Sequence, residues 1–174
     1  MTDPKHRLSL SNPIHLLALG FGGGLSPIMP GTVGTLVAIP FYWALVTFGG
    51  IVGLWSAIIV GGIAGIAICG RASKDMQVHD HGAIVWDEFV GFWLTMALVP
   101  TTDWKTVLAG FILFRLFDMA KPWPISWLDK HVHGGIGIMV DDILAGVMAM
   151  LSLWLLMTYM PTLFSMTHSV LIMQ

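Results

Sequence analysis

Five apolar segments, separated by Gly, Pro and charged residues, decide what this chain can fold into. They cover residues 32–48, 51–70, 84–99, 106–120 and 136–160. About 20 apolar residues in a helix span the hydrocarbon core of a bilayer, so segments of this length are typical of spanning or re-entrant helices. Strand-like alternation of apolar and polar residues is lacking. The sequence therefore predicts an all-α, polytopic membrane bundle of about four or five such helices.

The composition agrees with a membrane protein. The chain is 56% hydrophobic and only 10% charged, whereas soluble domains are about 25% charged. A net charge of −2 argues against nucleic-acid binding, and the single Cys69 excludes an internal disulfide. We expect one membrane-embedded domain over residues 1–174, with a flexible N-terminal tail at 1–11 and a C-terminal tail at 161–174. No obligate protein partner is evident.

The N-terminal apolar stretch, residues 14–25, resembles a signal peptide because Lys5 and Arg7 precede it. His15 and the glycines at 22–24 interrupt it, however, and no small-residue cleavage site follows. Asn12 as N-cap and Pro13 at the first helical position favour a short helix instead. Such a helix, about 18 Å long, is too short to span the bilayer, so we expect it at the membrane interface.

The distribution of Lys and Arg predicts the orientation of the bundle. If the chain changes sides with each segment, one side receives only Lys105, in the loop at 100–105. The other side receives the N-terminal tail and the loops at 71–83 and 121–135, with Lys5, Arg7, Arg71, Lys74, Lys121 and Lys130. The positive side faces the cytoplasm. We therefore expect a multi-pass protein of the bacterial cytoplasmic (inner) membrane.

Charged side chains gather on the cytoplasmic side of three segments. They lie at the start of the third, the end of the fourth and the start of the fifth: Asp87, Glu88, Arg115, Asp118, Asp141 and Asp142. Ionisable groups in spanning segments usually face the bundle interior and mark function. Five carboxylates repel one another more than Arg115 and Lys121 can offset. Mg²⁺ together with a bound phosphate suits such a set, with the arginine fork on the phosphate oxygens.

The stretch SPIMPGTVGT, residues 26–35, is a second candidate phosphate-binding element. Gly31 and Gly34 allow the backbone to approach a ligand, and Thr32 and Thr35 add hydroxyl groups before a predicted helix. The stretch is not a Walker A loop, because it lacks Gly-Lys-Ser/Thr. An ordinary Pro/Gly turn remains an alternative at this point.

Other interpretations of the polar residues also stand. In these interpretations each group has only a structural role: Asp87 caps a helix, Arg115 and Asp118 form an ion pair, and Asp141–Asp142 begin a helix. The paired histidines His79, His81, His131 and His133 are solvated loop residues or zinc ligands, and His81 or His133 could instead transfer a proton near the site.

Four stretches in this order resemble the phosphatidylglycerophosphatase A family, bacterial membrane enzymes of phospholipid synthesis. They are LSPIMPGTVGTLVAIP (25–40), HDHGAIVWDEFVGFW (79–93), FRLFDMAKPWPISWLD (114–129) and HGGIGIMVDDILAG (133–146). The resemblance implies an all-α fold and Mg²⁺-dependent hydrolysis of phosphatidylglycerophosphate to phosphatidylglycerol and phosphate. It also implies that the five acids are active-site positions.

On this basis we expect Mg²⁺ at Asp87 or Glu88 together with Asp141 or Asp142, and phosphate held by Arg115 and Lys121. Three roles are open for Asp118: it orients Arg115, it acts as a base, or it attacks phosphorus as a nucleophile. We favour the hypothesis that water, and not Asp118, attacks phosphorus.

Two other classes of function compete with this one. A proton- or ion-coupled transporter also uses buried acids, but its sites lie near the bilayer midplane between repeats, and no repeat is visible here. A scaffold without activity leaves the acids unexplained.

Overall fold

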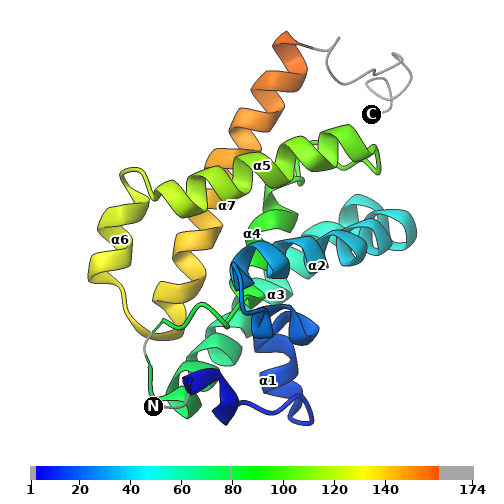
Figure 1. Cartoon of the computed structure of the whole chain (residues 1–174). Helices are drawn as coiled ribbons and strands as arrows, with labels where there is room; N and C mark the ends of the chain where they lie inside the picture. The colour runs from blue at the N-terminus through cyan, green and yellow to red at the C-terminus, as the bar shows by residue number, and fades with distance from the viewer. Residues whose placement is uncertain (1–2, 79, 161–174) are drawn as a thin grey trace.

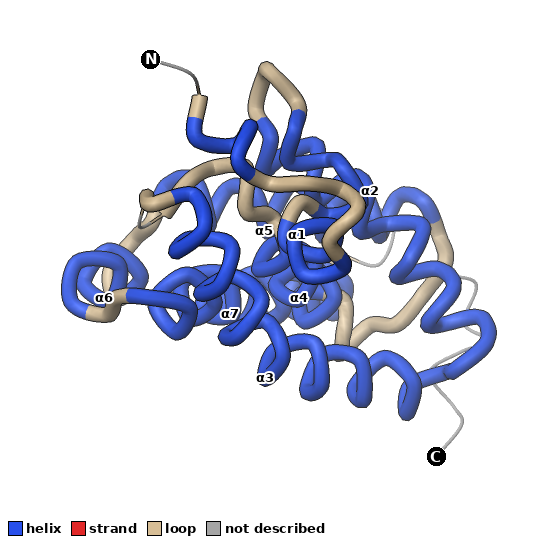
Figure 2. Tube along the Cα trace, turned by 90° about the horizontal axis from the view of Figure 1, so that it is seen from below, coloured by secondary structure: helices blue, strands red, loops and turns tan. Residues whose placement is uncertain are grey.

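The structure is a computed structural model that describes residues 3–78 and 80–160, and over these residues all regular elements are helices, as predicted. Figure 1 shows their arrangement, and Figure 2 shows the same chain from below. The α-helices are α1 Pro13–Ala18, α2 Pro30–Ala44, α3 Gly50–Met76, α4 Trp86–Thr95, α5 Trp104–Ala120, α6 Ile125–His131 and α7 Gly134–Tyr159. Three short elements complete the fold: η1 Pro4–Arg7, η2 Gly20–Leu25 and η3 Leu45–Gly49.

Helix α4 forms the centre of the bundle. Residues 87–95 are all buried, and α2, α3, α5 and α7 pack around them. Two indole groups of α4 donate hydrogen bonds to its neighbours: Trp86 Nε1 to the carbonyl of Gly61 on α3, at 3.1 Å, and Trp93 Nε1 to that of Ala38 on α2, at 3.2 Å. These bonds satisfy the polar end of each ring inside an apolar core.

The expected spanning segment at 84–99 is wrong in length. The helix has 10 residues and is therefore about 15 Å long, half of the roughly 30 Å hydrocarbon core. Met96 and Ala97 remain buried, but they lie in a turn that follows the helix. The apolar run continues beyond Thr95 because these residues pack in the core, not because the helix continues.

Helices α2 and α3 meet where the Gly49–Gly50 pair predicts a turn. Gly50 has φ +58° and ψ −156°, a region that is essentially restricted to glycine. The chain turns back there (Figure 1). Helix α3 then continues past Gly70, where the second segment was expected to end, and stops at Met76. Arg71 and Lys74 therefore lie on a helix and not in a loop.

Helix α5 ends where the sequence predicts. Pro122 disfavours the helical conformation in the residue before it, and Lys121 has the left-handed φ of 40°. The expected loop at 121–135, however, contains helix α6, which packs against α7. The prolines at 122 and 124 conceal this helix in the sequence.

The N-terminal residues support the segment that leads into α4. Asn12 caps α1 as predicted, because its side chain accepts a hydrogen bond from the Ile14 N–H at 2.9 Å. The helix ends at Ala18, earlier than the expected 14–25, and η2 follows it. The Val85 N–H donates to the Ala18 carbonyl at 2.8 Å, so α1 fixes the residue that precedes α4.

Two stretches of the described chain are long and apolar enough to cross a membrane, judged by length and composition. They are Pro30–Met76, which contains α2 and α3, and Gly134–Tyr159, which is α7. Membrane association follows from these two stretches and from the composition.

Candidate active site

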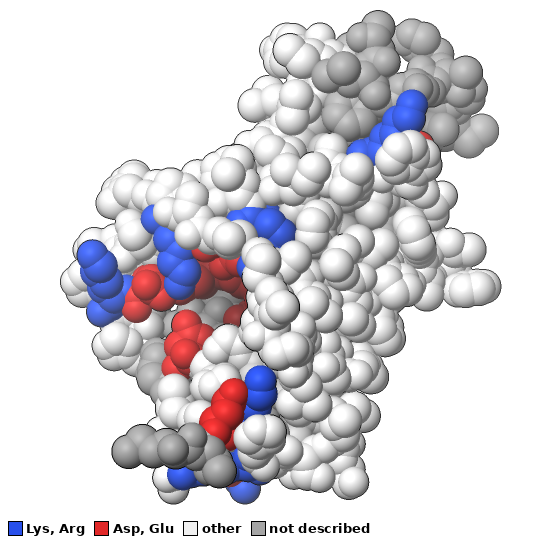
Figure 3. Space-filling model, viewed as in Figure 1, with Lys and Arg blue, Asp and Glu red and all other residues white. Residues whose placement is uncertain are grey.

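A cavity of about 190 Å³ lies among α4, α5 and α7 and the segment before α4. All five predicted acids line it; the full lining is Asp80, Gly82, Ile84, Asp87, Glu88, Asp118, Lys121, Ile138, Asp141 and Asp142. Figure 3 shows acidic side chains gathered in a hollow with basic side chains beside them, on a face that is otherwise largely uncharged. The expectation that three helices bring their acids together is confirmed.

The close crossing of α4 and α7 explains why their acids share this cavity. A Cβ on Gly91 would lie 2.8 Å from the backbone oxygen of Asp142, and one on Gly146 would lie 2.5 Å from the oxygen of Gly91. Any side chain at these positions would push the helices apart. Since Gly91 lies one turn after Glu88, the crossing holds the first turn of α4 beside Asp142.

Arg115 joins two of the helices through ion pairs. Its Nη1 atom lies 2.7 Å from Asp118 Oδ2, one turn later on α5, and 3.4 Å from Glu88 Oε1 on α4. The side chains of all three residues are at most 15% exposed, so the pairs are poorly screened by water. The guanidinium group is therefore held at the edge of the acidic cavity.

Lys121 makes a corresponding link at the end of α5. Its Nζ atom lies 2.7 Å from Asp129 Oδ1 on α6 and 3.1 Å from Asp141 Oδ2 on α7. Burial opposes the charged form of Lys121, but the hydrogen bonds to the two carboxylates outweigh it and raise the pKa of Lys121. The hydrogen bond from Lys121 lowers the pKa of Asp129.

Four carboxylate oxygens in the site are buried and have no hydrogen-bond partner within residues 3–78 and 80–160: Asp87 Oδ1, Glu88 Oε2, Asp141 Oδ1 and Asp142 Oδ2. Buried polar atoms are normally paired, so four such oxygens in one site require an explanation. Hard oxygen donors are the ligands that Mg²⁺ prefers, and the chemistry of this set fits that ion. Within the described residues, no three His, Cys, Asp or Glu side chains are already close enough together to hold a metal ion.

The first turn of α2 packs directly on Arg115 and Glu88. A Cβ on Gly31 would overlap Glu88 Oε1 and lie 3.2 Å from both terminal nitrogens of Arg115, and one on Gly34 would lie 3.0 Å from Glu88 Oε2. The backbone at Gly31 and Gly34 is therefore closely approached, as the sequence suggested, but the groups that approach it are the side chains of Glu88 and Arg115 and not a ligand.

The two threonines of this turn differ in their surroundings. Thr32 Oγ1 is buried and has no hydrogen-bond partner in the part of the chain that the structure describes, whereas Thr35 Oγ1 donates to the Gly31 carbonyl at 3.0 Å. Neither lines the acidic cavity. Only Thr32 therefore has a hydroxyl that is not already committed within α2.

Two acidic residues near the site, Asp80 and Asp129, were not predicted from the sequence. Asp80 lines the cavity and Asp129 binds Lys121. Asp129 ends the third family stretch and Asp80 falls in the second, so the stretches contained both residues, but the assumed loops gave them no position relative to the helical acids.

The histidines lie around the site rather than in it. His81 Nε2 is 3.2 Å from Asp3 Oδ1, and His81 Nδ1 accepts from the Ala83 N–H at 3.1 Å. His131 stacks on Trp127, and His133 lines another cavity. His79 lies outside the described residues. The described histidines do not converge on one point, so the zinc alternative gains no support.

Comparison with known proteins identifies the family. The sequence pattern described as phosphatidylglycerophosphatase A matches residues 16–157. The chain is 59% identical over 146 residues to phosphatidylglycerophosphatase A of Escherichia coli strain K12, covering 83% of this chain and 84% of that protein. It is 41% identical over 158 residues to phosphatidylglycerophosphatase A of Haemophilus influenzae, and this match covers 91% of this chain and 97% of that protein.

No solved structure matches the chain significantly. The match to the family runs from the second half of α1 through most of α7 and thus covers every residue that lines the acidic cavity. The chain belongs to the phosphatidylglycerophosphatase A family of phosphoric monoester hydrolases.

Proposed function

We propose that this chain hydrolyses phosphatidylglycerophosphate to phosphatidylglycerol and inorganic phosphate in the acidic cavity, with Mg²⁺ as cofactor. The reaction is that of its family. The observation that carries the assignment of the site is the convergence of six ionisable side chains from α4, α5 and α7 on one cavity: Asp87, Glu88, Asp118, Lys121, Asp141 and Asp142.

Four residues would hold the magnesium ion: Asp87, Glu88, Asp141 and Asp142. Each presents one buried oxygen that has no hydrogen-bond partner among the described residues and is free to act as a ligand. When bound, the ion polarises the phosphate and neutralises charge that develops on its oxygens. It also offsets the repulsion among carboxylates that the two basic side chains leave uncompensated.

Arg115 and Lys121 bind the phosphate of the substrate. The planar fork of Arg115 suits two phosphate oxygens, and Lys121 supplies a point charge. Asp118 orients Arg115, since its Oδ2 lies 2.7 Å from Nη1, and Glu88 holds the same nitrogen from the α4 side. These four residues are the catalytic group that we assign to the chain.

The first turn of α2 closes the phosphate side of the site. Gly31 and Gly34 allow the backbone to lie against Glu88 and Arg115, and Thr32, whose hydroxyl has no hydrogen-bond partner among the described residues, lies in the same turn. Thr35, whose hydroxyl is already bonded to the Gly31 carbonyl, contributes through the shape of the turn.

The reaction proceeds by direct attack of water. The water oxygen bonds to phosphorus while the bond from phosphorus to the glycerol oxygen breaks. The attacking water gives up one proton and the glycerol oxygen takes up one, so the products are phosphatidylglycerol and inorganic phosphate. Arg115 and Lys121 stabilise the negative charge that is spread over the phosphoryl oxygens in the transition state.

The site faces the cytoplasm of a multi-pass protein in the inner membrane. Six of seven Lys and Arg residues in the sequence-predicted loops and N-terminal tail fall on the side of the acids, which supports this orientation. The apolar stretches Pro30–Met76 and Gly134–Tyr159 support more than one crossing, because the first contains a reversal at Gly50.

Phosphate release from phosphatidylglycerophosphate tests the function. The purified chain in detergent is assayed with Mg²⁺ and with EDTA, as wild type and as Asp142→Asn. We expect EDTA and the substitution each to abolish release. Asp103→Asn is the matched control, since Asp103 lies outside the cavity and Asn retains its N-cap. Unchanged phosphate release in EDTA would show that the reaction does not need a metal ion. Ion flux in liposomes without phosphate release would favour a transporter.

A further inference from the structure

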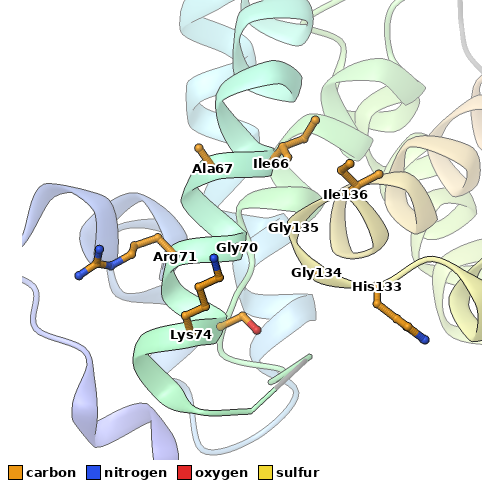
Figure 4. Close-up of a pocket in the computed structure, with 10 residues that line it drawn as sticks. Ile66, Ala67, Gly70, Arg71, Lys74, His133, Gly134, Gly135 and Ile136 are labelled. Carbon is orange, nitrogen blue, oxygen red and sulfur yellow. The ribbon is translucent and has the colours of Figure 1, made fainter.

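A second cavity, of about 610 Å³, lies between the end of α3 and the start of α7. It shares no lining residue with the acidic cavity. Helix α7 separates the two, because Ile136 lines the larger cavity and Ile138 lines the acidic one. Figure 4 shows the lining residues: Ile66, Ala67, Gly70, Arg71, Ser73, Lys74, His133, Gly134, Gly135 and Ile136.

One end of this cavity is cationic. Arg71 and Lys74 line it, and none of its described lining residues is acidic. Arg71 is engaged elsewhere: its Nε lies 2.9 Å from Asp75 Oδ2, and its side chain points away from α7 (Figure 4). Lys74 has no ion-pair partner in the part of the chain that the structure describes, and it extends back along α3 toward Gly70. Lys74 is therefore the charge that this cavity presents to a ligand.

The other end of the cavity is apolar and continues along α3. Ile59, Ile63 and Ile66 are spaced by four and three residues, so they share one face of the helix. They are 57%, 69% and 40% exposed. These three isoleucines form an apolar stripe within the stretch Pro30–Met76, which is apolar enough to cross a membrane. Lys74 lies beyond the stripe, near the C-terminal end of α3. Ile136 of α7 adds an exposed apolar side chain at the mouth of the cavity.

We propose that this cavity binds the headgroup of an anionic phospholipid, whose acyl chains lie along the apolar stripe of α3. A phosphodiester group beside Lys74 satisfies the charge of that residue, and the stripe receives the hydrocarbon chains. The complementarity is to an amphiphile and not to a free anion, because the cationic end and the apolar stripe are continuous. This site is distinct from the acidic cavity, with which it shares no lining residue.

Native mass spectrometry of the delipidated chain tests this proposal without any turnover. Dioleoylphosphatidylglycerol and dioleoylphosphatidylcholine are the probes. We expect one retained phosphatidylglycerol and weaker retention of phosphatidylcholine. A single lysine near a membrane surface changes binding by about fivefold, so Lys74→Ala should weaken the phosphatidylglycerol adduct by about that factor and Lys74→Glu by more.

Lys130→Glu is the matched control, because Lys130 lies on the same predicted side and lines neither cavity. It should leave the adduct unchanged; equal loss in both variants would overturn the proposal. Ala67→Trp, at an exposed position on the cavity wall, should also remove the adduct by filling the space. Displacement of the lipid by inorganic phosphate, or equal retention of phosphatidylcholine, would contradict an anionic-lipid site.

Discussion

Lys121 Nζ lies 2.7 Å from Asp129 Oδ1 and joins the end of α5 to α6. The same nitrogen reaches Asp141 on α7 at 3.1 Å, so Asp129 fixes the position at which Lys121 enters the acidic cavity. A residue of the short helix α6, which itself lies outside the cavity lining, thus controls the placement of a charge that we assign to phosphate binding.

Asp129→Asn should weaken phosphate binding through Lys121 while the fold is retained. The two side chains are 31% and 37% exposed, so the ion pair contributes at most about 1 kcal/mol after screening by solvent. We expect kcat/KM to fall about two- to fivefold, mainly through KM. Steady-state kinetics on phosphatidylglycerophosphate give this value, and Asp129→Glu should restore most of the loss. An unchanged KM in Asp129→Asn would show that Asp129 does not position Lys121.

The contribution of this pair to stability should depend on pH at both ends of the scale. The pKa of Asp129 is lowered in the folded chain, so its contribution is present above the unfolded value of about 3.9 and is lost as the pH falls through the folded pKa. The pKa of Lys121 is raised, so its contribution is present below about 10.4 and is lost as the pH rises through the folded pKa.

Thermal unfolding of wild type and Asp129→Asn across the pH range measures this effect. The difference in melting temperature should be present near neutral pH and should shrink below about pH 4, where Asp129 becomes protonated. A difference that grows on acidification would be opposite to the expected sign.

The sequence was sufficient to group the acids because each lies at one end of an apolar segment. If successive helices run in opposite directions, the start of one lies beside the end of the one before it, and this places Asp87, Asp118 and Asp142 at one end of the bundle. The contact between helices was not predictable in the same way. Gly91 and Gly146 set the distance between α4 and α7, and nothing in the sequence distinguishes them from the other glycines of the chain.

Gly31→Ala should disrupt the site because the new Cβ would overlap Glu88 Oε1 and press on Arg115. Overpacking of this kind costs roughly 1–3 kcal/mol, and it displaces two side chains that we place in the catalytic group. We expect a lower melting temperature and a loss of phosphate release. Gly62→Ala is the matched control: it lies inside α3, its Cβ would meet only Val90 Cγ1 at 3.9 Å, and it should be neutral or stabilising.

Arg115→Lys should reduce kcat/KM on the order of 100-fold, the usual effect of removing one preorganised donor from a transition state. A lysine keeps the charge but lacks the planar fork that we assign to the phosphate oxygens, whereas the arginine has further N–H donors besides Nη1, which binds Asp118 and Glu88. Kinetics together with a melting curve separate the loss of activity from a loss of fold. Wild-type kcat/KM in this variant would show that the fork of Arg115 is not used on the phosphate.

The errors in the predicted fold have a common physical cause. Apolar composition marks burial, in a membrane or in a protein core, and does not mark helix length. Met96 and Ala97 are therefore apolar although α4 has already ended. The prolines at 122 and 124 concealed α6, which begins directly after them at Ile125 and ends at His131. Asp129 was missed because it lies in α6, which was expected to be a loop, and the neighbours of a loop residue cannot be predicted from helix geometry.

The central claim is that the acids of α4 and α7 act together in one site, and a double-mutant cycle on kcat/KM tests it most directly. The variants are Asp87→Asn, Asp142→Asn and the combination, each checked for fold by its melting curve. Since groups that act as a unit are strongly non-additive, we predict that the double variant loses about as much activity as either single variant. Losses that multiply would contradict a shared site.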